Sequence, residues 1–195
     1  MRSLLLIAAA VVLTGVGIGI GGCAPQVAMN PRERGDSMVS NHHYDAAVYW
    51  YTRALETNPN DGPAYAGRGR ALSQNINVDE WPADKPNANL PAALADYDRA
   101  AQLMPTEWPQ LYANRGCVRA ASGDLPGALS DMDQAIHLNP NEPYFPGYRG
   151  LVLLRMHRDE EAQVEFVHFT NRLPGAKGQL QRYINRIKAK RDATS

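Results

Sequence analysis

The fold is decided by residues 109–142, which read PQLYANRGCVRAASGDLPGALSDMDQAIHLNPNE. Two stretches with helical spacing lie on either side of a break at residues 122–124, Ser-Gly-Asp. In the second stretch, Ala128, Met132 and Ala135 are spaced i, i+4, i+7, so they share one face of a helix. The segment therefore predicts two helices joined by a short turn.

The same pattern recurs four times along the chain. From the glycine to the proline of each repeat is 24 residues in three repeats and 36 in the second, which therefore carries an insertion of 12 residues. Such internal periodicity indicates a stack of similar supersecondary units. The columns are Gly35, Gly69, Gly116 and Gly150; Ala47, Ala93, Ala128 and Ala162; Tyr51, Tyr97, Met132 and Phe166; Ala54, Ala100, Ala135 and Phe169; and Pro59, Pro105, Pro140 and Pro174.

These columns resemble the tetratricopeptide-repeat family, whose unit is a helix-turn-helix of 34 residues. The resemblance covers residues 28–176 as four units. It departs from the family pattern at the first-helix tryptophan position, which holds Pro31, Tyr65, Tyr112 and Pro146, and at the leucine before the glycine, which is always arginine here. The resemblance implies an all-α fold, a right-handed solenoid of four helix-turn-helix repeats with a C-terminal capping helix.

The repeat register sets the predicted divisions of the chain. The first helix of the first repeat contains Pro31 and no aromatic residue, so we expect it to fray. A helix over about 178–191 follows the fourth repeat, and its apolar face suits the cap that a repeat stack requires. The divisions are a signal segment at 1–22, a lipidated cysteine and tether at 23–30, repeats at 28–61, 62–107, 109–142 and 143–176, and the capping helix and tail at 177–195.

The N-terminus has the pattern of a secretory signal. A short basic start precedes an apolar run at residues 4–20, which Gly21, Gly22 and Cys23 follow. The small residues before Cys23 resemble a bacterial lipoprotein signal, which implies acylation of Cys23 and stable membrane anchoring. An uncleaved signal anchor is the competing interpretation. Because residue 24 is alanine, the resemblance implies the periplasmic face of the outer membrane, if the organism has one.

An arginine precedes the glycine in every repeat. Four stacked guanidinium groups are typical of a phosphate or carboxylate site. An acid one residue before the aromatic or methionine column of repeats two to four favours a second interpretation, in which each arginine pairs within its own repeat. The predicted pairs are Arg68–Asp96, Arg115–Asp131 and Arg149–Glu165, with Arg34 stacked on Trp50.

The family resemblance places a partner-binding groove along the first helices of the repeats. Its mixture of polar and aromatic residues favours a partly apolar peptide or a partner helix. Alternatively, some of its tyrosines pack on the C-terminal cap, and Cys117 is a small packed residue rather than a reactive thiol. The implied groove residues are Arg32, Asp36, Arg70, Gln74, Gln110, Asn114, Cys117, Tyr144, Tyr148, Leu151 and Arg155.

The insertion at residues 75–89 contains Trp81, which is either an interface anchor or a residue that folds back on its own repeat.

Composition and motifs narrow the function further. The 20 basic and 20 acidic side chains argue against a nucleic-acid binder, and two cysteines exclude a disulfide scaffold. We find no GxSxG, phosphate-loop, CxxC or HExxH motif, and the adjacent His42 and His43 point apart if helical. We therefore expect no cofactor, no metal and no catalysis, and a membrane-anchored adaptor for protein or peptide partners. The alternative is a small-ligand or cell-wall glycan binder, or an enzyme, that uses the groove arginines and tyrosines.

Overall fold

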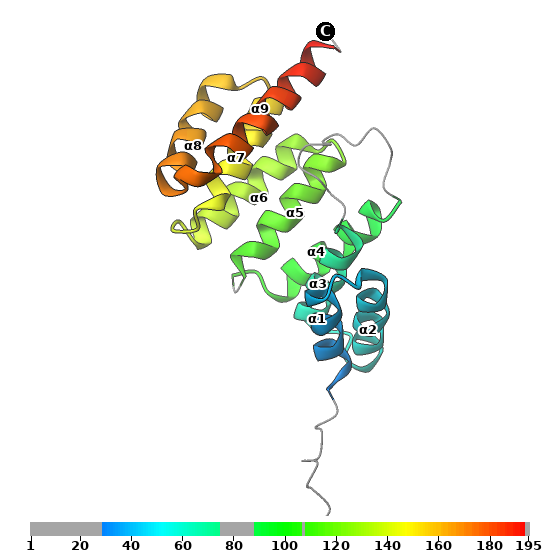
Figure 1. Cartoon of the computed structure of the whole chain (residues 1–195). Coiled ribbons are helices and arrows are strands. Elements are labelled where there is room, and N and C mark those ends of the chain that lie inside the picture. The colour runs from blue at the N-terminus through cyan, green and yellow to red at the C-terminus, as the bar shows by residue number, and fades with distance from the viewer. Residues whose placement is uncertain (1–28, 75–87, 107, 194–195) are drawn as a thin grey trace, which may run out of the picture.

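The computed structural model describes residues 29–74, 88–106 and 108–193, and every regular element within these ranges is helical. This confirms the predicted all-α class. The elements are α1 Pro31–Ser40, α2 Tyr44–Thr57, α3 Gly62–Leu72, α4 Leu90–Leu103, α5 Pro109–Ala121, α6 Leu125–Leu138, α7 Tyr144–Arg155, α8 Asp159–Arg172, the 3-10 turn η2 Pro174–Ala176 and α9 Lys177–Asp192 (Figure 1).

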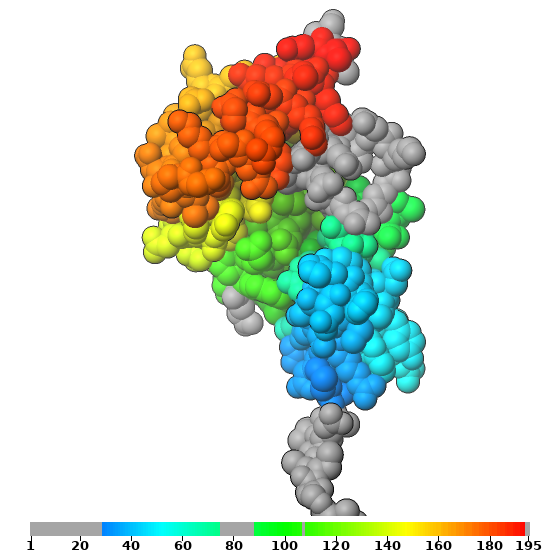
Figure 2. Space-filling view, in the orientation of Figure 1, coloured from blue at the N-terminus to red at the C-terminus, as the bar shows by residue number. Residues whose placement is uncertain are grey.

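The helices pack as four consecutive pairs. Each pair contacts the next through the second helix of one repeat and the first helix of the following repeat, as in α2 with α3, α4 with α5, and α6 with α7. The helix α9 packs on α7 and closes the C-terminal end (Figure 1). The space-filling view shows the repeats following one another from the N-terminal to the C-terminal end (Figure 2). This is the arrangement of a repeat solenoid.

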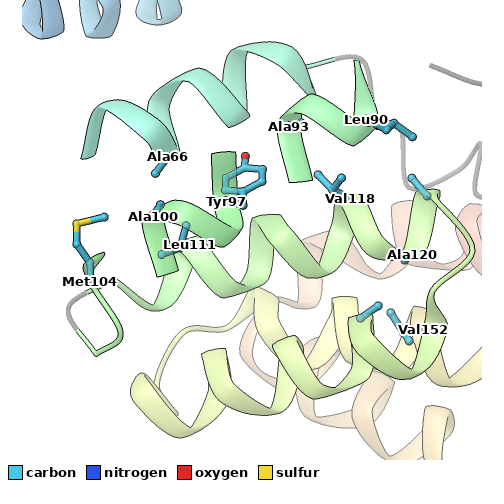
Figure 3. Close-up of a cluster of buried hydrophobic side chains, with 12 residues drawn as sticks. Ala66, Leu90, Ala93, Tyr97, Ala100, Met104, Leu111, Val118, Ala120 and Val152 are labelled. Carbon is cyan, nitrogen blue, oxygen red and sulfur yellow. The ribbon is translucent and has the colours of Figure 1, made fainter. Parts of the chain in front are cut away.

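The core consists of the small and aromatic columns that define the repeat. The four column alanines, among them Ala93 and Ala128, have no exposed surface. In one cluster Ala93, Tyr97 and Ala100 of α4 pack with Ala66, Leu111 and Val118 (Figure 3). A Cβ atom at Gly116 would lie 2.9 Å from Cε of Met132, so the glycine permits the close approach of α5 and α6. None of the helices in the described ranges is long and apolar enough to cross a membrane.

The first helix corrects one expectation. Instead of fraying, α1 begins with a capping box in which Asn30 Oδ1 accepts from the backbone N–H of Glu33 at 2.9 Å. The Glu33 carboxylate in turn accepts from the backbone N–H of Asn30 at 3.0 Å. Pro31 occupies the first turn, where its missing N–H costs no helical hydrogen bond. These local bonds compensate for the missing aromatic residue.

The turns inside repeats one, three and four share one backbone motif. His42, Gly123 and His157 have φ values of 60°, 90° and 60°, which lie in the left-handed region. The backbone N–H of each residue, and that of the residue after it, bonds back to the preceding helix, as in a Schellman motif. Glycine meets this requirement without steric cost, whereas both histidines adopt the conformation against their preference.

We expect His157→Gly to stabilise the fold by roughly 0.5–1 kcal/mol. A left-handed residue with a side chain costs about 1–2 kcal/mol, and the greater freedom of glycine in the unfolded chain offsets about 0.5–1 kcal/mol of the gain. Urea unfolding of the full chain measures the difference. His157→Ala, which keeps Cβ, is the matched control and should show no such gain. Equal stability of the glycine and alanine variants would contradict this account of the turn.

Candidate functional site

The arginine column lies at the junction of the two helices of each repeat. Arg68 donates to both carboxylate oxygens of Asp96 at 2.7 and 2.8 Å. The corresponding distances are 2.6 Å from Arg115 to Asp131 and 2.8 Å from Arg149 to Glu165. The structure thus brings together the three pairs expected from the sequence. In repeat one the guanidinium carbon of Arg34 lies 4.5 Å from the centroid of the Trp50 ring, also as expected.

Each arginine of repeats two to four also bonds to the preceding repeat. Arg115 Nη1 donates to Asp98 at 3.0 Å, and Arg149 Nε donates to Asp133 at 2.6 Å. Arg68 Nη1 donates to the Thr52 hydroxyl at 3.1 Å. Sequence reasoning missed these second partners, although they form a column of their own: Thr52, Asp98 and Asp133 all lie two residues after the column of intra-repeat partners.

This network decides between the two interpretations of the arginine column. The Asp131 side chain is 3% exposed, and it also pairs with Arg119 at 3.1 Å. Burial raises the pKa of its carboxyl group, and hydrogen bonds from Arg115 oppose that rise. The guanidinium groups of Arg68, Arg115 and Arg149 are occupied by neighbours, so they do not form an open anion site. An enzyme or glycan binder built on the arginine column therefore loses its main residues.

We expect Asp131→Asn to lower the free energy of unfolding by roughly 1–3 kcal/mol, because it leaves Arg115 and Arg119 beside a neutral amide. Urea unfolding checks this. Asp133→Asn removes a carboxylate that is 53% exposed, so this control should cost at most about 1 kcal/mol. An Asp131→Asn variant that unfolds like the parent would refute the role assigned to the pair.

A concave cavity of about 470 Å³ lies between the first helices of the repeats. It includes side chains from α1, α3, α5 and α7, from the turns after α1 and α3, and one tyrosine each from α2 and α4. Five of the expected groove residues line it, namely Arg70, Gln74, Asn114, Cys117 and Tyr148. The family positions do not include the other lining residues, which lie at or next to helix ends, in α4 or within α5: Val39, Ser40, His42, Tyr44, Ser73, Tyr97 and Val118.

The cavity wall is more apolar than polar, and it is nearly uncharged. Among its described lining residues, Arg70 carries the one permanent charge. Burial raises the pKa of the Tyr148 hydroxyl and of the Cys117 thiol to about 12 in each case. Both groups are therefore neutral at physiological pH, and Cys117 is a packed thiol rather than a nucleophile. The amides of Gln74 and Asn114 add donors and acceptors, so the wall is suited to hydrogen bonding with a peptide backbone.

Two of the expected groove residues near the C-terminal end lie elsewhere. Leu151 is only 2% exposed and packs with Phe166, Leu180 and Ile187, so its assignment to the groove was wrong. The helix α9 packs against α7, and this contact buries the residue. Tyr144 is half exposed, and its ring lies 6.2 Å from that of Phe169 in α8. Tyr144 therefore contacts α8 of its own repeat and not the C-terminal cap α9, so this contact does not test the alternative expected for some of the tyrosines.

The remaining groove candidates make local contacts. Burial lowers the pKa of Arg155 to about 10. The contacts are Arg32 Nε with the Asp61 carboxylate at 3.4 Å, Asp36 accepting from the Tyr51 hydroxyl at 2.7 Å, Gln110 donating to Asn114 at 3.1 Å, and Arg155 donating to the Ala120 carbonyl at 2.7 Å.

Two predicted sites, Cys23 and Trp81, lie outside the described residues. Within the described ranges, no group of three or more His, Cys, Asp or Glu side chains is arranged to hold a metal ion. The residue His42 lies instead at the rim of the concave cavity, where its Nδ1 is 2.9 Å from the Tyr44 hydroxyl.

Solved structures of other proteins share this arrangement of helices. Neither a family model nor a curated protein matches the sequence. MamA from Desulfovibrio magneticus RS-1 is 17% identical, with a TM-score of 0.62 over 74% of this chain and 75% of that one. YrrB, described as a TPR protein with an unusual peptide-binding site, is 19% identical, with a TM-score of 0.63 over 83% of this chain and 76% of that one. The first TPR of Spaghetti (RPAP3), bound to an HSP90 peptide, is 20% identical, with a TM-score of 0.56 over 65% of this chain and 90% of that one.

The stacked helix pairs define a helical-repeat solenoid. Its four units have the fold of tetratricopeptide repeats, as the likeness to the TPR structures of YrrB and RPAP3 shows.

Proposed function

We propose that this protein is a non-catalytic, membrane-anchored adaptor that holds a peptide segment of a partner protein in its concave cavity. The observation that carries the proposal is the cavity itself, which combines side chains from the first helices of all four repeats. The peptide-binding site described for YrrB and the HSP90 peptide bound to RPAP3 support a partner of this kind.

The size of the cavity favours an extended segment over a whole helix. A helix with its side chains is about 10–12 Å wide, whereas a volume of about 470 Å³ suits a few residues of extended chain. Backbone groups of such a segment would bond to Gln74 and Asn114. Its apolar side chains would contact the rings of Tyr44 and Tyr148, which line the cavity and are partly exposed, and Arg70 would favour an acidic residue beside them.

The anchor in this proposal is the acylated Cys23, which would hold the repeats at the periplasmic face of the outer membrane. The lipoprotein-like pattern before Cys23 supports this part. The process that the adaptor serves, whether assembly, secretion or control of cell-wall enzymes, depends on the identity of its partner.

The proposal predicts that Tyr148→Ala loses partners that the parent captures. The experiment is a crosslinked pull-down of the full-length protein from native membranes, read by mass spectrometry. Tyr148 lines the cavity, so truncating it removes packing surface from the bound segment. Tyr49→Ala is the matched control, because Tyr49 is exposed on α2 and lies outside the cavity.

Partners retained by Tyr148→Ala and lost by Tyr49→Ala would contradict the location of the site. The absence of any specific partner from both the parent and the variants would contradict the adaptor function. When the cells are supplied with labelled palmitate, the parent should incorporate the label and Cys23→Ser should not. A parent that takes up no label, or a Cys23→Ser protein that takes it up equally, would contradict the lipid anchor alone.

A further inference from the structure

Repeats two and three differ from repeat four in the residue that lies three positions before the column arginine. Repeats two and three place a tyrosine in the first helix, Tyr65 and Tyr112, three residues before the column arginine. Tyr112 is buried, its ring lies 5.3 Å from the guanidinium carbon of Arg115, and its hydroxyl donates to the carbonyl of Pro105. The Tyr65 ring lies 5.7 Å from the guanidinium carbon of Arg68. The ring therefore fills the space beside the arginine.

Repeat four has Pro146 at this position, and a cavity of about 460 Å³ lies beside its arginine. The cavity walls are the repeat-four counterparts of the Tyr112 surroundings. Pro140 corresponds to Pro105, Ile136 to Ala101, Asp133 to Asp98 and Arg149 to Arg115. His137, Pro146, Glu165, His168 and Arg172 complete the lining.

The larger aromatic residue of repeat four does not occupy this space. Phe169 replaces the alanine that the other repeats have in this column. Its ring packs against Gly147, where an added Cβ atom would lie 2.8 Å from the ring. It does not line the cavity. The volume vacated by the tyrosine ring is therefore left open beside Arg149.

Repeat four retains the arginine and the proline carbonyl that contact Tyr112 in repeat three. The apolar residues packed with Tyr112 differ, because Gly147 and Phe169 take the places of Ala113 and Ala135. Asp133 and Glu165 bond to the edge of the Arg149 guanidinium at 2.6 and 2.8 Å, which leaves its flat face for a ring. The Pro140 carbonyl accepts from Arg172 at 2.8 Å, and a carbonyl oxygen has a second lone pair for a hydroxyl group. A phenol ring thus finds a cation face, an acceptor and the apolar wall of Ile136.

We propose that this cavity binds a phenol ring, supplied by a tyrosine side chain of a partner protein, in the place that the chain's own tyrosine takes in repeats two and three. We assign a protein source because the ring beside the arginine in repeat three is itself a tyrosine side chain on a polypeptide backbone. The cavity shares no lining residue with the concave cavity. It is therefore a second contact site, and it stands without the proposed function.

NMR titration of the full-length protein tests the site with two probes. One probe is 4-methylphenol, the tyrosine side chain alone, and the other is N-acetyltyrosine amide, which carries the backbone. Both should give saturable amide shifts at Ile136, His137 and Arg149. Pro146→Tyr should abolish these shifts by filling the cavity from within, and it should raise the melting temperature. Pro146→Ala, which leaves the cavity open, is the matched control and should retain binding.

A second occluding variant keeps the test decisive if Pro146→Tyr does not fold. His168→Trp alters an exposed residue on the rim and should also abolish binding. Arg70→Ala, in the concave cavity, should leave the titration unchanged. Shifts that are absent, lie elsewhere or persist in both occluded variants would overturn the site. Binding of 4-methylphenol with exclusion of the amide would overturn the protein source.

Discussion

The structure depends on one repeated interaction. An arginine in the first helix of a repeat bonds to the second helix of its own repeat and also to the second helix of the preceding repeat. In repeats three and four the arginine bonds to an acid of its own repeat and to an acid of the preceding repeat, as Arg115 does with Asp131 and Asp98. Such an arginine fixes both the angle between the two helices of its repeat and the position of that repeat relative to the preceding one. The desolvation of Asp131 opposes the Coulomb attraction, so we assign the pair to the register of packing more than to net stability.

The ends of the arginine series differ from its middle. No repeat precedes Arg34 within the described ranges, and Arg34 stacks on Trp50 and donates to the Met29 carbonyl at 3.2 Å. At the other end Val167 occupies the position of Asp98 and Asp133, and it is exposed. Because a valine side chain accepts no hydrogen bond, α8 lacks the second acceptor that α4 and α6 offer to the following arginine. Within this frame two cavities with different chemistry lie on separate surfaces, one beside Arg70 and one beside Arg149.

Most of the fold could be predicted from the sequence, because each column repeats the same local requirement. Spacing alone placed the C-terminal helix, expected over about 178–191 and observed as α9, and the pairing of each arginine of repeats two to four with its own acid. The partners in the preceding repeat were missed because they depend on how repeats stack, which no single repeat encodes. The spacing of Asn30 and Glu33 is that of a capping box and favours a stable start of α1. The prediction that α1 frays followed instead from its missing aromatic residue.

The sites were less predictable than the fold. Family positions located Arg70, Asn114 and Tyr148 correctly at the concave cavity, but they assigned Leu151 to it although α9 covers that residue. The cavity beside Arg149 had a sequence signal in the proline that replaces tyrosine at position 146. The proline alone does not predict the cavity, because a missing ring leaves a cavity only where no neighbouring side chain fills the space.

The most direct test of the central claim is a double-mutant cycle between Arg115 and Asp131. The free energy of unfolding would be measured for the parent, Arg115→Ala, Asp131→Ala and the double variant. If the shared guanidinium sets the helix packing, the two changes are coupled by roughly 0.5–3 kcal/mol, as for other residues in one network. Additive effects, with a coupling energy near zero, would show that the arginine column is incidental to the fold.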